Sequence, residues 1–201
     1  MKLCKPPRII LASVSPWRKK ILSTTGIPFC VEESGYKEDM ELPLAPRVLA
    51  RRLALGKARA CLRRRAVAGR HNDAVVIGAD TFVVFRGKLL GKPHTAARAR
   101  AMLLMLSGKT HTILTGFAIV DSKTKRYVSK TIATRVIFRK LSAREISDYI
   151  KTGEPLKAAG AYVIQGQGAK LIRKTSGDLD SVAGLPIAEV LKSLAKFGVK
   201  V

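Results

Sequence analysis

The chain has 201 residues, of which 47% are apolar, and this is enough for one domain with a sizeable interior. No apolar run approaches the roughly 20 residues of a membrane-spanning helix, and the run Ile9–Ala12 is too short for the core of a signal peptide. Lysine and arginine number 38 against 14 acids, so the net charge is +24 and the surface attracts polyanions of any class. We expect a soluble, cytoplasmic protein that forms one domain over residues 1–201 and does not enter a membrane.

The cysteines and the acids differ in how much they say about function. Cys4, Cys30 and Cys61 are odd in number and widely spaced, and they form neither a CxxC pair nor a zinc pattern. We expect buried or idle reduced thiols. The acids are more informative, because with only fourteen carboxylates each one that interrupts an apolar segment is conspicuous.

The first half of the chain alternates short strands with helices. Ser15 can cap a helix whose first turn suits Pro16, and Gly26 can end it. Farther along, Ala79 and Asp80 separate two strand-like runs. The elements expected here are a strand at 9–12, a helix at about 16–25, a short strand at 29–32, a helix at about 46–65, and strands at 74–78, 81–85 and 88–90.

The second half continues in the same mixed order. Ser142 and Glu145 form a capping box, and Gly153 stops the helix that this box begins. The elements expected here are a helix at 95–106, paired strands at 110–120 and 127–139, the capped helix, two segments at 161–164 and 169–172 around a glycine loop, and a last helix that ends near Gly198. Strands joined both by hairpins and by helices predict an α/β fold with a mixed sheet.

The turn after the first strand is a candidate phosphate site. Ser13 and Ser15 precede a helix, and Arg18 lies in its first turn. Helix N-termini bind phosphate because they present unpaired N–H groups and the positive end of the helix dipole. The alternative is an ordinary helix cap with basic residues that face solvent.

Three further residues are candidates for chemistry. Asp80 interrupts an apolar run, where a carboxylate is costly unless it is paired or bound to metal, so it is either a metal ligand and water activator or the partner of an arginine. Lys92 lies in a tight Gly-Lys-Pro loop and could bind phosphate oxygens. Gln165 precedes a Gly-Gln-Gly turn, and its amide could read the edge of a nucleobase; the alternative is a plain turn.

A run of basic residues without any acid occupies positions 51–70. Its members are Arg51, Arg52, Lys57, Arg59, Arg63, Arg64, Arg65 and Arg70. Such a run is either a nucleic-acid face or a solvated helix face. The run holds no aromatic residue for base stacking, which weakens an interpretation as a single-strand binding surface.

Six collinear motifs resemble those of the Maf family of nucleotide pyrophosphatases. They are Leu11-Ala12-Ser13-Val14-Ser15-Pro16-Trp17-Arg18, Ile77-Gly78-Ala79-Asp80-Thr81, Leu90-Gly91-Lys92-Pro93, Leu106-Ser107-Gly108-Lys109-Thr110-His111, Ala159-Gly160-Ala161-Tyr162-Val163-Ile164-Gln165-Gly166 and Val182-Ala183-Gly184-Leu185-Pro186. The resemblance implies a two-lobed α/β fold of the Maf/ITPase-like type with a central cleft, and frequent homodimers. It also implies Mg²⁺- or Mn²⁺-dependent hydrolysis of a nucleoside triphosphate to the monophosphate and pyrophosphate.

The resemblance assigns roles to individual positions. Asp80 matches the essential acid, a metal ligand or water activator, and Glu38 matches a second acid, although Tyr36 and Lys37 depart from the usual residues there. The residues implied to hold the triphosphate are Arg18, Lys57 and Lys92, and Ser13 matches a hydroxyl of the N-terminal signature that is implied to bind substrate.

The base preference implied by the resemblance is mixed. Gln165 is typical of the branch that acts on dTTP and UTP, whereas Trp17 is typical of the branch that acts on 7-methyl-GTP and could stack on a cationic base. Because the motif around Gln165 covers more residues, we expect dTTP and UTP. The alternatives are 7-methyl-GTP, the related inosine/xanthosine triphosphate pyrophosphatases, and a basic regulator whose partner is nucleic acid.

Overall fold

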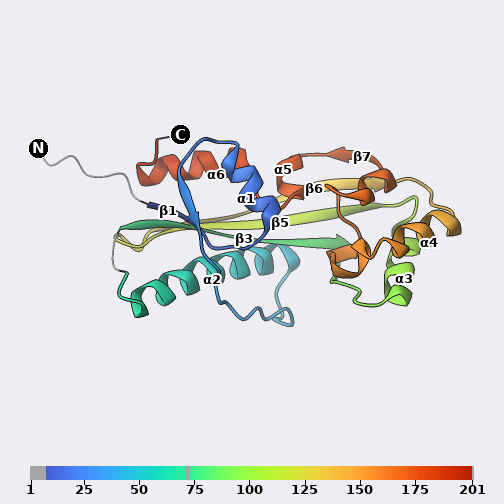
Figure 1. Ribbon diagram of the computed structural model, residues 1–201, viewed down its shortest axis with the longest axis horizontal. Helices are drawn as coiled ribbons and strands as arrows, with labels where there is room; N and C mark the ends of the chain where they lie inside the picture. The colour runs from blue at the N-terminus through green and yellow to red at the C-terminus, as the bar shows by residue number, and fades with distance from the viewer. Residues whose placement is uncertain (1–7, 71–72, 201) are drawn as a thin grey trace, which may run out of the picture. The chain divides into compact units, whose positions relative to one another are not determined.

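The computed structural model describes residues 8–70 and 73–200 (Figure 1). The contacts within the chain divide it into two compact units. Unit 1 comprises the described residues of 1–80, 115–132 and 184–201, and unit 2 comprises 81–114 and 133–183. Cys4 lies outside the described residues. Within them, no helix has the length and apolarity to cross a membrane. That residues 1–201 form one domain with a central cleft stays a prediction.

The helices and strands follow the expected order closely. The strands are β1 (Arg8–Leu11), β2 (Phe29–Val31), β3 (Ala74–Phe85), β4 (Lys88–Leu90), β5 (Thr110–Asp121), β6 (Tyr127–Phe138) and β7 (Ile172–Ser176). The helices are α1 (Pro16–Ser23), α2 (Pro46–Val67), α3 (Ala96–Leu106), α4 (Ala143–Lys151), α5 (Leu179–Val182) and α6 (Ile187–Leu194). Short 3₁₀ turns are η1 (Glu154–Lys157), η2 (Ala159–Ala161), η3 (Gln167–Leu171) and η4 (Ala195–Phe197).

The strands form one mixed sheet in the order β2-β1-β3-β5-β6-β7, with β4 paired to β3. Strand β1 runs parallel to β2 and β3, whereas β4 is antiparallel to β3 and β7 is antiparallel to β6. The prediction of an α/β fold with a mixed sheet is therefore confirmed. Strands β3, β5 and β6 each contribute residues to both units.

One sequence expectation was wrong at the centre of the sheet. The runs 74–78 and 81–85 are not separate strands, because β3 continues through Ala79 and Asp80 without a break. Asp80 is tolerated inside a buried strand because its carboxylate accepts a hydrogen bond from the ammonium of Lys57. Strand β7 and helix α5 were not expected from the sequence.

The core of unit 1 has two layers, one on each face of its strands. Alternate residues such as Ile9 and Ile77 face one layer with Leu194 of α6, while their neighbours Ile10 and Val76 face the other. This second layer includes Ala58 and Cys61 of α2. The two-residue period of a strand sorts the side chains in this way. Burial raises the pKa of the Cys61 thiol to about 11, so it keeps its proton at neutral pH.

Two glycines let α2 lie unusually close to the sheet. A Cβ atom at Gly78 would stand 2.2 Å from the backbone oxygen of Ala54, and one at Gly116 would stand 2.3 Å from the backbone oxygen of Ala50. Any larger residue would push the helix away from β3 and β5. The close approach fixes the inward face of α2, which carries Lys57, against the strand that carries Asp80.

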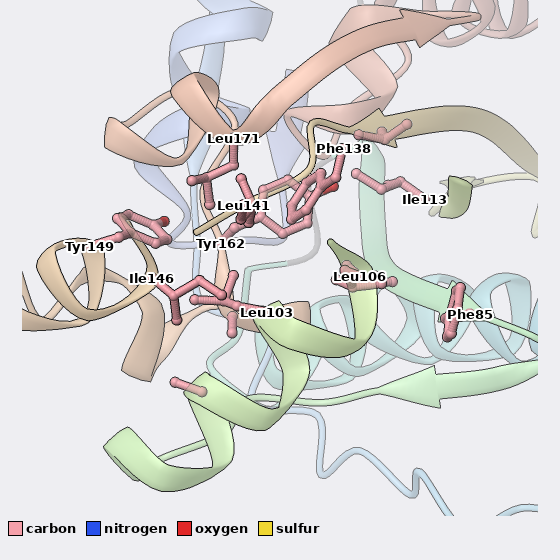
Figure 2. Close-up of a cluster of buried hydrophobic side chains, with 14 of the residues drawn as sticks. Phe85, Leu103, Leu106, Ile113, Phe138, Leu141, Ile146, Tyr149, Tyr162 and Leu171 are labelled. Atoms are coloured by element: carbon pink, nitrogen blue, oxygen red, sulfur yellow. The ribbon is translucent and has the colours of Figure 1, made fainter. Parts of the chain in front are cut away.

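Unit 2 has its own hydrophobic core (Figure 2). Leu103 of α3 and Ile146 of α4 pack with Phe138 of β6 and Tyr162. His111 is buried here at 2% exposure, edge-on to the rings of Phe138 and Tyr162, and its Nε2 lies 2.7 Å from the hydroxyl of Tyr162. Its Nδ1 has no hydrogen-bond partner among the described residues.

The burial of His111 predicts a stability that falls in mild acid. Burial lowers the pKa of His111 from 6.5 to about 4, so between these values the unfolded chain binds more protons than the folded chain. Stability is therefore full above about pH 6.5 and falls as the pH drops towards 4. We expect a loss of about 2 kcal/mol between pH 7.5 and pH 5 from this residue, measured by urea unfolding. His111→Phe should make the unfolding free energy nearly independent of pH in this range. The control His94→Asn changes an exposed histidine and should not alter the pH dependence.

Candidate active site

The turn between β1 and α1 gathers polar groups at the start of the helix. Ser15 caps α1, since its Oγ accepts a hydrogen bond from the backbone N–H of Arg18 at 3.5 Å. Ser13 is nearly buried, and its Oγ accepts from the backbone N–H of Ser15 at 3.3 Å. The expected strand, cap and helix are all present. That this helix N-terminus binds phosphate stays a prediction.

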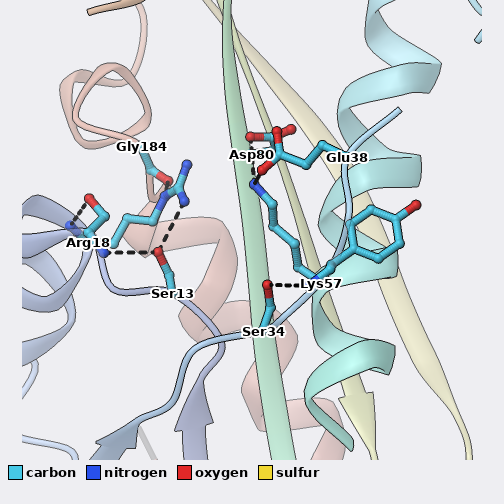
Figure 3. A network of polar contacts seen from close by, with 9 residues as sticks. Ser13, Arg18, Ser34, Glu38, Lys57, Asp80 and Gly184 are labelled. Carbon is cyan, nitrogen blue, oxygen red and sulfur yellow. Dashed lines mark hydrogen bonds and ion pairs between the residues drawn. The ribbon is translucent and has the colours of Figure 1, made fainter. Parts of the chain in front are cut away.

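Arg18 is held by two oxygen atoms of unit 1 (Figure 3). Its Nε donates to the carbonyl of Gly184 at 2.9 Å, and its Nη1 donates to Oγ of Ser13 at 3.2 Å. Burial lowers the pKa of the guanidinium, while the carboxylates of Asp80 and Glu38 raise it. Arg18 is thus oriented by its neighbours and coupled electrostatically to both acids. Gly184 lies in the motif Val182–Pro186, but nothing in the sequence indicates that its carbonyl accepts a hydrogen bond from Arg18.

Lys57 connects the two predicted acids. Its Nζ lies 2.9 Å from Oδ1 of Asp80 and 2.8 Å from Oε1 of Glu38. Asp80 comes from the middle of β3 and Lys57 from the inward face of α2, whereas Glu38 comes from the coil between β2 and α2. The side chains of Asp80 and Lys57 are nearly buried, and that of Glu38 is 41% exposed. The structure therefore brings together three residues that are far apart in the sequence.

Tyr36 explains how the coil delivers Glu38 to this place. A Cβ atom at Gly56 would stand 2.4 Å from the ring of Tyr36, so the ring lies directly on α2 where the helix has no side chain. The hydroxyl of Ser34 accepts a hydrogen bond from the backbone N–H of Tyr36 and stabilises the bend. The ring of Tyr36 fits against α2 because Gly56 leaves room for it.

Asp80 and Glu38 are the two acids of this network that could hold a hard divalent cation. Burial raises the pKa of Asp80, and although Lys57 counteracts this, the pKa stays above its ordinary value. The carboxylates of Asp80 and Glu38, which come from separate segments of the chain, both contact the ammonium of Lys57. Within the described residues no cluster of three or more His, Cys, Asp or Glu side chains is suited to metal. Two carboxylates suffice for Mg²⁺ where phosphate oxygens and water complete the coordination.

Trp17 lies at the start of α1 but outside this network. Its side chain is half-buried, and the ammonium of Lys20 lies 5.8 Å from the centre of its ring. A cation of the chain itself therefore already interacts with this ring.

Lys92 and Gln165 belong to unit 2. Lys92 is exposed in the loop after β4, and this loop is tied down because the carbonyl of Gly91 accepts from the N–H of Gly160 at 3.1 Å. Gln165 lines a hollow of about 170 Å³. The other lining residues are Thr81, Val83, Ile113, Ala159, Tyr162, Val163, Ile164 and Val182. That Lys92 and Gln165 act together with Asp80 stays a prediction.

Glu154 is a functional candidate that sequence reasoning missed. Its carboxylate accepts hydrogen bonds from the N–H groups of Gln167 and Gly168 and from the hydroxyl of Tyr149, at 2.6 to 3.1 Å. The hydroxyl of Tyr149 in turn accepts from the N–H of Val163 at 3.2 Å. Together the two side chains hold both ends of the segment 163–168, which carries Gln165. An acid after the helix-ending Gly153 has no local signal for this role.

Comparison with known proteins assigns the chain to a family. Residues 8–197 match the family model described as Maf-like protein, and the chain belongs to this family. The dTTP/UTP pyrophosphatase of Moorella thermoacetica is 44% identical over 194 residues, which are 96% of this chain and 97% of that protein. The dTTP/UTP pyrophosphatase of Pelotomaculum thermopropionicum is 42% identical over 193 residues, 96% and 98% of the two chains.

Among solved structures, a nucleoside-triphosphatase / dITP/XTP pyrophosphatase from Mycobacterium abscessus is 18% identical to this chain. The superposition covers 68% of this chain and 75% of the Mycobacterium abscessus chain, with a TM-score of 0.37, which is a loose likeness only.

Proposed function

We propose that this chain is a dTTP/UTP pyrophosphatase, which hydrolyses these nucleotides to the monophosphate and pyrophosphate. The observation that carries the proposal is the convergence of Asp80 and Glu38 on Lys57, with Arg18 coupled to both acids. The names of the full-length relatives support the same substrates.

The basic residues of the site bind and stabilise the phosphates, and Asp80 orients the attacking water. Arg18, oriented by Gly184 and Ser13, binds phosphate oxygens, and Lys57 offsets the negative charge that grows on the departing pyrophosphate. A part for Lys92 in binding phosphate stays a prediction from the family resemblance. A water attacks the α phosphorus, the bond from that phosphorus to the α–β bridging oxygen breaks, and Asp80 orients the water and accepts its proton.

Asp80 and Glu38 would hold Mg²⁺ or Mn²⁺, which when bound supplies positive charge beside the phosphate oxygens. Glu38 is exposed enough to turn towards such an ion, whereas Asp80 is fixed in the middle of a strand. The metal, a homodimeric state and a cytoplasmic location stay predictions.

The hollow at Gln165 supports a pyrimidine as the base. The amide of Gln165 can donate to one position of the uracil or thymine edge and accept from another. A 7-methylguanine stacked on Trp17 is less favoured, because the cation of Lys20 already lies near that ring.

The test is release of pyrophosphate from dTTP, UTP, CTP, 7-methyl-GTP and ITP, first with Mg²⁺ and then with Mn²⁺. We expect kcat/KM for dTTP and UTP to exceed that for the other nucleotides by at least about tenfold, and EDTA to stop the reaction. Preference for 7-methyl-GTP would overturn the base assignment, and no release from any nucleotide would overturn the activity.

A further inference from the structure

The outward face of α2 is basic without interruption. Between Glu41 and Asp73 the sequence holds nine basic residues and no acid. The structure sorts these residues by direction, since Lys57 and Arg65 are buried against unit 1 while Arg52, Arg59 and Arg63 are exposed. The exposed arginines therefore lie on the side of α2 opposite Lys57 and take no part in its contacts with Asp80 and Glu38.

Arg52, Arg59 and Arg63 form one stripe along the helix. Their spacing of seven and then four residues places them on the same side of an α-helix, over about 16 Å along its axis. We call these three residues the arginine stripe.

The arginine stripe makes no ion pair with any described residue. Arg59 and Arg63 are one turn apart, where like charges repel each other. The guanidinium of Arg59 lies over the ring of Tyr127 at 5.0 Å, and this tyrosine is itself 51% exposed. An uncompensated row of positive charge beside an exposed aromatic ring suits a polyanion that also carries flat bases.

The basic surface continues beyond the helix. Leu62 and Ala66 of α2 line a hollow of about 150 Å³ together with Lys123 and Lys125 of the turn between β5 and β6. Lys123 and Asp73 lie 3.5 Å apart, and both side chains are well exposed, so this weak pair yields easily to a stronger anion. The lysines of the turn thus add positive charge beside α2, the helix that carries the arginine stripe.

We propose that the arginine stripe binds the phosphodiester backbone of a nucleic-acid strand. Arginine pairs with phosphate through two parallel N–H groups, and a backbone supplies phosphates in a row. An anionic membrane fits less well, because α2 buries its apolar face in unit 1, and its exposed apolar residues Val48 and Val67 lie at opposite ends of the helix and form no face that could insert between lipids.

The test measures binding of fluorescent 20-nucleotide RNA and DNA strands, single and double, to the full chain by anisotropy over a range of salt concentrations. The variant Arg52→Gln, Arg59→Gln, Arg63→Gln removes the stripe. The variant Arg98→Gln, Arg100→Gln, Arg173→Gln changes the net charge equally at exposed arginines of unit 2 and is the matched control.

We expect the stripe variant to weaken binding at least about tenfold at 0.1 M salt and to reduce the slope of log K against log salt by about 2 to 3, because each phosphate that the variant no longer binds lowers the slope by about one. The control variant should change binding by less than about threefold. Pyrophosphate release should be unchanged in both variants, which shows that both are folded.

Three results would overturn the proposal. One is absence of strand binding by the wild-type chain at 0.1 M salt, and another is an equal loss in both triple variants, which would mean that charge anywhere suffices. The third is tighter binding to vesicles of anionic phospholipid, lost in the stripe variant, which would assign the surface to a membrane instead.

Discussion

Replacing Asp80 by Asn should reduce kcat/KM for dTTP by at least about 10³-fold while the chain stays folded. Asn has the same shape as Asp but carries no charge, so it neither accepts a proton from water nor attracts a divalent cation. The ammonium of Lys57 keeps its partner Glu38 at 2.8 Å, so no buried charge is left alone and the fold survives. Pyrophosphate release measures the loss of activity, and the far-ultraviolet circular dichroism spectrum shows whether the variant is folded.

The matched control is Asp73→Asn, which neutralises an exposed acid of unit 1 that contacts only Lys123 in the described part of the chain. It should retain full activity. A folded Asp80→Asn protein with more than about a tenth of wild-type activity would contradict the role of this carboxylate.

Replacing Glu154 by Ala should affect substrate binding more than turnover. The loss removes hydrogen bonds to two N–H groups and to the hydroxyl of Tyr149, so the segment that carries Gln165 loses its fixed shape. We expect the KM for dTTP to rise about tenfold or more, with kcat within about threefold, because the groups at Asp80 are untouched. We also expect a loss of about 2–3 kcal/mol in unfolding free energy, which lowers the melting temperature by about 4–12 °C.

Two variants separate positioning of the loop from general stability. Glu154→Gln keeps one carbonyl oxygen and should recover part of the affinity. Glu145→Ala removes the capping box of α4, which lowers the stability of the chain and leaves the KM unchanged. An unaltered KM in Glu154→Ala would show that the segment does not take part in binding the base.

The sequence predicted those parts of the site whose signals are local. A strand, a serine cap and a helix with Arg18 in its first turn are visible in eight consecutive residues, and the structure confirms them. Asp80 was conspicuous because acids are rare in apolar runs. The same reasoning produced the error in β3, since an acid was taken to break a strand when its partner Lys57, 23 residues earlier, in fact keeps it there.

Contacts between distant segments could not be predicted in this way. Only the family resemblance distinguished Lys57 from the seven other basic residues of positions 51–70. Its spacing from Leu53, Ala54 and Cys61 places it on the buried side of α2, and this is a usable signal in the sequence itself. Glu154 offers no such signal, because its partners lie in a loop 13 and 14 residues later and the pairing depends on 3₁₀ turns.

The interleaving of the two units has a consequence for how the chain can be divided. Unit 1 is assembled from three separate stretches of sequence and unit 2 from two, and three strands pass from one to the other. Neither a single proteolytic cut nor a truncation of the chain therefore yields either unit as one continuous segment. We therefore expect limited proteolysis to yield no stable fragment of half size, and amide hydrogen exchange in β3, β5 and β6 to report one cooperative opening rather than two.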